Sequence, residues 1–182
     1  MTNESIKKAV AAVGVKFGAI VLSPSTGESQ ESSIGWIKLI EFAKPRLELG
    51  LSVNGYWVRS TPNGLLEVKS LENLVSLLPC LEVSYRRFTE CLANGIGEFA
   101  LPQELLAEFP WQDLVQIGLR DSASAHWQTL ALEWAKHLDL IEPLVDILKI
   151  MASKGKSQEL RHNAKHILKE GGKWNWRDFP QS

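Results

Sequence analysis

Apolar and polar positions alternate with a helical period over the first part of the chain. Apolar side chains at intervals of three and four predict an amphipathic helix over residues 4 to about 21, and a second helix from residue 34 onward. Pro45 ends the second helix, because the residue before a proline disfavours the helical conformation. Residues 23–33 carry no apolar side chain, so we expect an exposed loop between the two helices.

The period then changes from helical to that of a strand. Leucine and valine alternate with polar or small residues over residues 47–53, which predicts a half-buried strand. Asn54-Gly55 is the preferred pair for a type I′ turn, since both central residues of that turn need a positive φ. A return strand, a second turn and a third strand are expected at residues 56–59, 62–64 and 65–69. The pattern therefore predicts a three-stranded antiparallel meander over 47–69, covered by the two N-terminal helices.

From Ser70 onward the pattern predicts only helices. Serines suited to N-caps, helix-opening prolines and Asn-Gly or Gly-Gly stops mark their ends. The expected helices span residues 71–78, 81–93, 102–108, 110–120, 125–138, 143–153 and 158–170. The predicted fold class is thus α+β, mainly α, with a helix and meander region at 1–70 and a helical array at 71–182. The two regions are compatible with one continuous domain.

The last four expected helices repeat with an offset of 33 residues. The offset superimposes Pro110 on Pro143, Ser124 on Ser157 and Ala131 on Ala164, and most other paired positions keep their apolar character. Each copy is a helix opened by proline, a turn containing serine, and a second helix with a small residue at the helix contact. This pattern is typical of a stacked helical hairpin.

The repeated segment resembles a HEAT or armadillo-type repeat over about residues 110–170. The resemblance lies in the apolar pattern of residues 143–148 for the first helix and 160–168 for the second. It implies two HEAT-like hairpins, a binding scaffold sometimes carried in multisubunit assemblies, and no catalytic residues. Because about three repeats are needed to bury a continuous face, we expect the preceding helices and the aromatic tail at 174–179 to cap the array.

The chain shows no enzyme signature. It lacks a nucleophile elbow and a phosphate-binding loop, and Cys80 and Cys91 fit neither a redox motif nor a zinc half-site. His162 and His166 are spaced for chelation from one helix, but they lie opposite its apolar side without an accompanying carboxylate. We therefore expect no catalytic residue, cofactor or metal. The first residues lack a signal peptide pattern and no segment is long enough to cross a membrane, so we expect a cytoplasmic protein.

Charge is the one unusual feature. The net charge is only −1, but two adjacent segments of the chain carry large charges of opposite sign. Residues 90–146 carry a local charge of −8 and residues 147–177 a local charge of +6. Such asymmetry can mark a surface for an acidic partner or for nucleic acid, although adjacent helices of opposite sign can also simply complement one another. The candidate partner-binding residues are Lys154, Lys156, Arg161, His162, Lys165, His166, Lys169 and Lys173. We expect a protein partner first and nucleic acid as the alternative.

Overall fold

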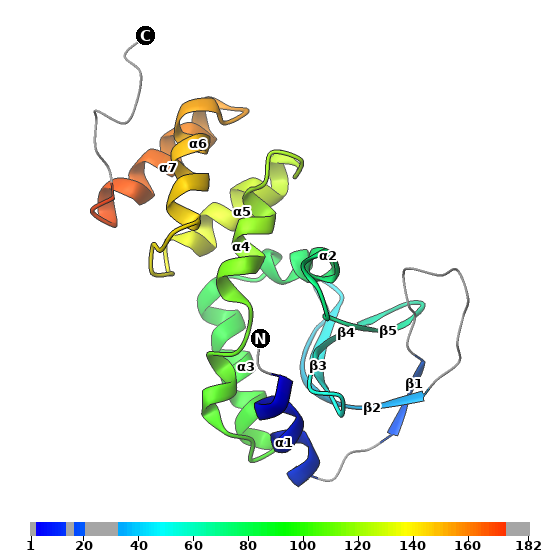
Figure 1. The fold of residues 1–182 in the computed structure, drawn as a ribbon. Coiled ribbons are helices and arrows are strands. Elements are labelled where there is room, and N and C mark those ends of the chain that lie inside the picture. Colours follow the sequence, from blue (N-terminus) through cyan, green and yellow to red (C-terminus); the bar gives the residue numbers. More distant parts are fainter. Residues whose placement is uncertain (1–2, 14–16, 21–32, 174–182) are drawn as a thin grey trace. The chain divides into compact units, whose positions relative to one another are not determined.

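The computed structural model describes residues 3–13, 17–20 and 33–173, and the chain divides into two compact units, Met1–Pro110 and Trp111–Ser182 (Figure 1). The described residues form an α+β fold in which helices predominate. The boundary expected at residue 70 falls inside the first unit, because a helix following that position packs against the sheet. The loop expected at 23–33 and the aromatic tail lie outside the described residues, apart from Ser33.

The first unit is built on a five-stranded sheet in which neighbouring strands follow one another along the chain and pair antiparallel. The strands are β1 (Phe17–Ile20), β2 (Ser33–Phe42), β3 (Leu47–Ser52), β4 (Trp57–Thr61) and β5 (Gly64–Glu67). The predicted meander is confirmed as β3–β5, and β1 and β2 extend it. Since β1 also approaches β5, the sheet curls back on itself.

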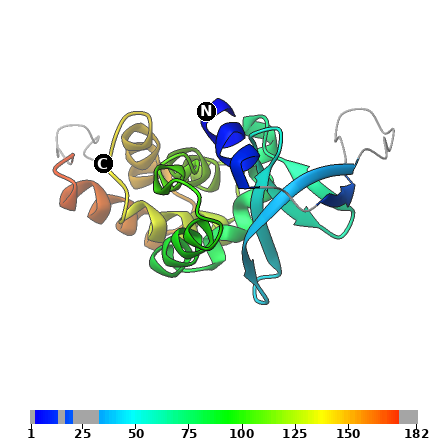
Figure 2. The same cartoon turned by 90° about the horizontal axis from the view of Figure 1, so that it is seen from below.

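The helix predicted over residues 4 to about 21 is a helix only over Asn3–Val13, because residues 17–20 form β1. The helix predicted from residue 34 onward is wrong, because this segment belongs to β2. A bulge between Lys38 and Ile40 explains the error in β2. The extra residue at a bulge shifts the alternation of faces, so Leu39 and Ile40 are both buried and the apolar spacing imitates a helix. Figure 2 shows β2 as a long, bent strand.

The turn between β3 and β4 has three residues between the hydrogen-bonded pair Ser52 and Tyr56, and it is not of type I′. Ser52 N–H donates to Tyr56 O, and Gly55 N–H donates to Ser52 O, each over 2.9 Å. Gly55 has a φ of 83°, whereas Asn54 is not among the described residues with positive φ. A left-handed glycine closing a three-residue loop satisfies the hairpin without a left-handed asparagine.

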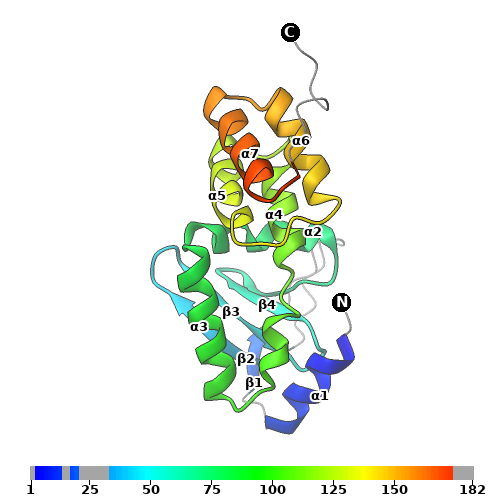
Figure 3. The same cartoon turned by 90° about the vertical axis from the view of Figure 1, so that its left-hand side faces the viewer.

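Besides the strands, the described residues of the first unit form five helical segments: α1 (Asn3–Val13), α2 (Leu71–Leu74), the 3₁₀ helix η1 (Val75–Glu82), α3 (Tyr85–Glu98) and the 3₁₀ helix η2 (Gln103–Leu106). Helix α1 contacts β3, and α3 packs on β2 (Figure 3). The aromatic core lies in the same unit: Trp57 and Phe109 meet edge to face at 5.1 Å, and Phe88 lies 5.2 Å from Phe109. This core ties the sheet to the segment following α3.

Two helix ends in this unit differ from the prediction. Ser70 caps α2 by accepting from Asn73 N–H, as expected, but the helix becomes a 3₁₀ helix that continues through Pro79. Helix α3 continues past Asn94 and Gly95 to Glu98, although this pair was expected to end it. Tertiary packing at Gly95 therefore outweighs the low helix propensity of glycine.

The described residues of the second unit form four helices at the predicted places: α4 (Trp111–Leu119), α5 (Ala125–Ala135), α6 (Leu144–Lys154) and α7 (Gln158–Glu170). They form two hairpins, with α4 beside α6 and α5 beside α7 (Figure 3). Ser124 and Ser157 cap α5 and α7 in the same manner, each accepting from the backbone N–H three residues on. Ala131 and Ala164 are both fully buried. These two pairs of positions, each 33 residues apart, thus have the same local structure.

Candidate functional site

A pocket of about 500 Å³ lies within the second unit. Its lining comes from the end of α4 and the residues after it, from Gln128 on α5, and from the last two turns of α6 with the residues that follow. The apolar part of the lining consists of Leu119, Ile147, Ile150 and Met151. The polar part consists of Arg120, Asp121, Gln128, Lys154 and Lys156. Apolar walls with a few polar groups are typical of ligand-binding pockets.

The most exposed apolar side chain of the pocket is Ile150, which retains 60% of its accessible surface. It follows the buried Leu148 and precedes the buried Met151 and Ala152 on α6. Ile150 therefore lies outside the buried stripe of its own helix. An exposed isoleucine on the wall of a pocket can gain hydrophobic free energy only when a ligand or partner covers it.

The backbone around the pocket is held by three side-chain hydrogen bonds. Lys156 Nζ donates to the carbonyls of Asp121, over 2.5 Å, and Ala123, over 2.9 Å. Gln128 Nε2 donates to Arg120 O over 2.9 Å. These bonds fix the α4–α5 connection to the α6–α7 turn and to α5. A binding site with such a framework loses less conformational entropy when a ligand binds.

Three polar groups of the pocket remain available. Gln128 is 2% exposed, and within the described part of the chain its Oε1 has no hydrogen-bond partner. Arg120 and Lys154 are exposed, and neither side chain forms an ion pair with another described residue. A buried acceptor without a donor is unfavourable, so the described lining of the pocket contains one residue with a buried, unsatisfied acceptor and two available cations.

The structure divides the eight residues predicted from charge into four groups. Lys154 and Lys156 line the pocket, and Arg161 Nη1 donates to Gly155 O over 2.7 Å at the end of α6. Lys173 is exposed beyond α7. The remaining four are exposed on α7 and form the α7 basic face: His162, Lys165, His166 and Lys169.

The α7 basic face is not a purely cationic surface. Glu159 and Glu170 are exposed on the same helix, and His166 Nδ1 lies 3.1 Å from Glu170 Oε2. Of the eight residues, only Lys154 and Lys156 meet at the pocket. Counting charges along the sequence missed three residues of the pocket: Arg120, Gln128 and Ile150. Of these, only Ile150 could have been found from the sequence, because it is an isoleucine outside the apolar stripe of its helix.

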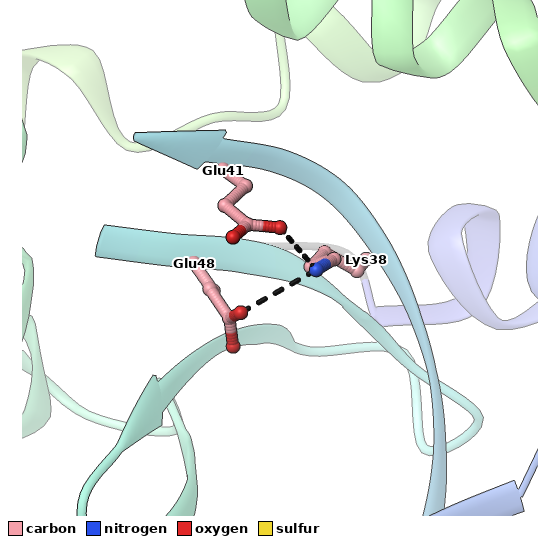
Figure 4. A network of polar contacts seen from close by, with 3 residues as sticks. All are labelled: Lys38, Glu41 and Glu48. Atoms are coloured by element: carbon pink, nitrogen blue, oxygen red, sulfur yellow. Dashed lines mark hydrogen bonds and ion pairs between the residues drawn. The ribbon is translucent and has the colours of Figure 1, made fainter. Parts of the chain in front are cut away.

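A second polar cluster lies on the sheet of the first unit (Figure 4). Lys38 Nζ on β2 contacts Glu41, and it lies 3.4 Å from Glu48 Oε1 on β3. The hydrogen bond to Glu41, with help from Glu48, raises the pKa of Lys38 above its usual value. The two glutamates keep Lys38 charged. Because all three side chains are in contact with solvent, the cluster is a cross-strand ion pair of modest stabilising effect.

The cysteines and histidines do not form a reactive cluster. Cys80 is fully buried, and burial raises the pKa of its thiol to about 12. Among residues 3–13, 17–20 and 33–173, no group of three or more histidine, cysteine or carboxylate side chains could hold a metal ion. In the same residues, no helix is long and apolar enough to cross a membrane.

No family model, curated protein or solved structure matches this chain.

Proposed function

We propose that the protein is a non-enzymatic interaction module, acting as a subunit of a larger assembly, and that it binds a partner protein through the pocket of its second unit. The observation that carries this proposal is the combination of an exposed Ile150 with the available cations Arg120 and Lys154 around one pocket. Protein interfaces commonly combine an apolar centre with a polar rim. The resemblance to HEAT-type scaffolds supports the same function.

Nucleic-acid binding through the α7 basic face is the alternative. The exposure of all four of its residues favours this alternative. The exposed Glu159 and Glu170 on the same helix oppose it, because they would repel a phosphate backbone. We therefore rank the protein partner first.

The test compares two matched isoleucines of the second unit. Ile150 lines the pocket and Ile141 does not, although they are similarly exposed, at 60% and 52%. The tagged full-length chain, Ile150→Asp and Ile141→Asp are purified from cells of the source organism. Proteins that accompany the first chain are then purified and titrated against all three chains by calorimetry.

We expect one partner to bind the unaltered chain and Ile141→Asp with equal affinity, and to bind Ile150→Asp at least about tenfold more weakly, because an aspartate is unfavourable in an apolar contact. Circular dichroism checks that both variants are folded. Equal binding by all three chains would exclude the pocket as the binding surface.

A further inference from the structure

The apolar lining of the pocket suits a branched aliphatic group. Leu119, Ile147, Ile150 and Met151 provide the apolar wall, and none of the described lining residues carries an aromatic ring. At roughly 30 Å³ per water-sized group, a pocket of about 500 Å³ has room for one or two amino-acid residues. The occupant is therefore a short element of a partner rather than a whole helix.

The charged groups of the pocket favour an anion. Among the described lining residues, three cations outweigh the one carboxylate, that of Asp121. Lys156 already donates to two backbone carbonyls, which leaves Arg120 and Lys154 as the cations available to a ligand. An anionic group beside the aliphatic group would pair with these two side chains.

Gln128 adds the requirement for a hydrogen-bond donor. Its Nε2 donates to Arg120 O, so the orientation of the amide is fixed, and Oε1 is a buried acceptor without a hydrogen-bond partner. Aliphatic carboxylates without an N–H cannot satisfy this oxygen. A peptide supplies one backbone N–H for almost every residue, next to its side chains.

We propose that the pocket recognises an acidic peptide segment in which a branched aliphatic residue is followed by a glutamate or aspartate. The aliphatic side chain packs against Ile147 and Ile150, the carboxylate pairs with Arg120 and Lys154, and a backbone N–H donates to Gln128 Oε1. This inference rests on the proposed function and names the chemistry of the partner segment.

Four fluorescein-labelled hexapeptides test the inference with the full-length chain. They share the sequence Gly-Ser-X-Z-Ser-Gly-amide, with Leu-Glu, Leu-Gln, Leu-Lys or Ala-Glu at the two central positions. In fluorescence anisotropy at low salt we expect the Leu-Glu peptide to bind, and each of the others to bind at least about tenfold more weakly. Equal binding of the Leu-Glu and Leu-Lys peptides, or no binding of any peptide at millimolar protein, would overturn the proposal.

Charge reversal identifies the cation. Lys154→Glu should lose the Leu-Glu peptide and gain affinity for the Leu-Lys peptide, whereas Lys169→Glu, on α7 and outside the pocket lining, should change neither affinity. Gln128→Met keeps the approximate size of the side chain but removes the acceptor, and should weaken binding of the Leu-Glu peptide about two- to tenfold. An identical loss in Lys154→Glu and Lys169→Glu would indicate non-specific attraction and overturn the assignment.

The two proposals can fail separately. If the natural partner depends on Ile150 but the Leu-Glu peptide does not bind, the peptide chemistry is wrong and the interaction function stands. If the natural partner binds equally well to Ile150→Asp, the function assigned to the pocket is wrong. A single-stranded oligonucleotide that binds the unaltered chain and is lost in Lys154→Glu would overturn the peptide assignment in favour of nucleic acid.

Discussion

Gly95 on α3 lies directly against the carbonyl of Leu39 on β2, so close that a Cβ atom at Gly95 would be 2.1 Å from Leu39 O. Leu39 is the residue at the bulge of β2, where the strand changes the face that it presents. The absence of a side chain at Gly95 lets the backbone of the helix approach the backbone of the strand. This contact explains why α3 continues through a glycine.

Gly95→Ala should destabilise the first unit by about 1–3 kcal/mol, because the helix or the strand must move to accommodate the methyl group. Gly97, two residues along the same helix, is the matched control. A Cβ at Gly97 would meet only the end of the Gln103 side chain, at 3.7 Å. Gly97→Ala should therefore increase stability by about 0.4–1 kcal/mol. Urea unfolding measures both values, and equal effects at the two glycines would contradict the close contact.

The same contact shows why part of the fold could not be read from the sequence. Asn94-Gly95 is a common helix stop, and only the position of Leu39 some 55 residues earlier makes Gly95 an interior helical residue. The bulge in β2 likewise gave a strand the apolar spacing of a helix. In contrast, the meander and the four helices of the second unit are marked by local turn and cap residues, and these elements were predicted at their observed places.

The two N-cap serines of the second unit should contribute similarly to stability. Ser124 Oγ accepts from Trp127 N–H over 3.4 Å, and Ser157 Oγ accepts from Leu160 N–H over 3.1 Å. Ser124→Ala and Ser157→Ala should each cost about 0.5–2 kcal/mol. Ser122 is exposed and precedes the cap, so Ser122→Ala should change the free energy of unfolding by less than about 0.5 kcal/mol. A cost at Ser122 as large as that at Ser124 would contradict this assignment of the cap.

Ala131 and Ala164 should respond alike to enlargement. Both are fully buried on the second helix of their hairpin, where α5 and α7 contact each other and their partner helices. Ala131→Leu and Ala164→Leu should each destabilise the protein by about 1–3 kcal/mol through overpacking. The exposed Ala125, at the start of α5, provides a control in Ala125→Leu, which should be nearly neutral. Neutral effects at both buried alanines in denaturant melts would argue against the equivalence of the hairpins.

Cys80 should make the free energy of unfolding depend on pH in the alkaline range. Burial raises the pKa of its thiol from 9.0 to about 12, so the folded protein keeps the proton in a range where the unfolded chain releases it. Stability should therefore be lost progressively as the pH rises above about 9. Cys80→Ala should be less stable at neutral pH because of the cavity it leaves, but its stability should fall less steeply between pH 9 and 11. Parallel urea melts across this range measure the difference, and identical slopes would show that Cys80 does not contribute.

The candidate site was predictable only in part, and the reason is physical. A count of charges along the chain selects every lysine and arginine of a basic segment, but it does not show which of them is engaged by the backbone. Lys156 and Arg161 are held by carbonyl groups, whereas Lys154 is available. Arg120 belongs to the acidic segment 90–146, and it is part of the site only because the α4–α5 connection lies at the pocket. The backbone contacts of each cation and the position of the α4–α5 connection therefore decide which of the many charged residues form the site.

The α7 basic face provides the last test, because it separates the two candidate functions. If this face contacted a phosphate backbone, log affinity would fall with log salt by about 0.7–0.9 per contact, and Lys165→Glu with Lys169→Glu would abolish binding. The nearby Glu159 and Glu170 weaken such an interaction, so we expect no binding of single- or double-stranded oligonucleotides in fluorescence anisotropy at tens of micromolar protein and low salt. Tight binding that disappears in the Lys165→Glu/Lys169→Glu double variant but persists in Lys154→Glu would instead assign nucleic-acid recognition to α7, independently of the pocket.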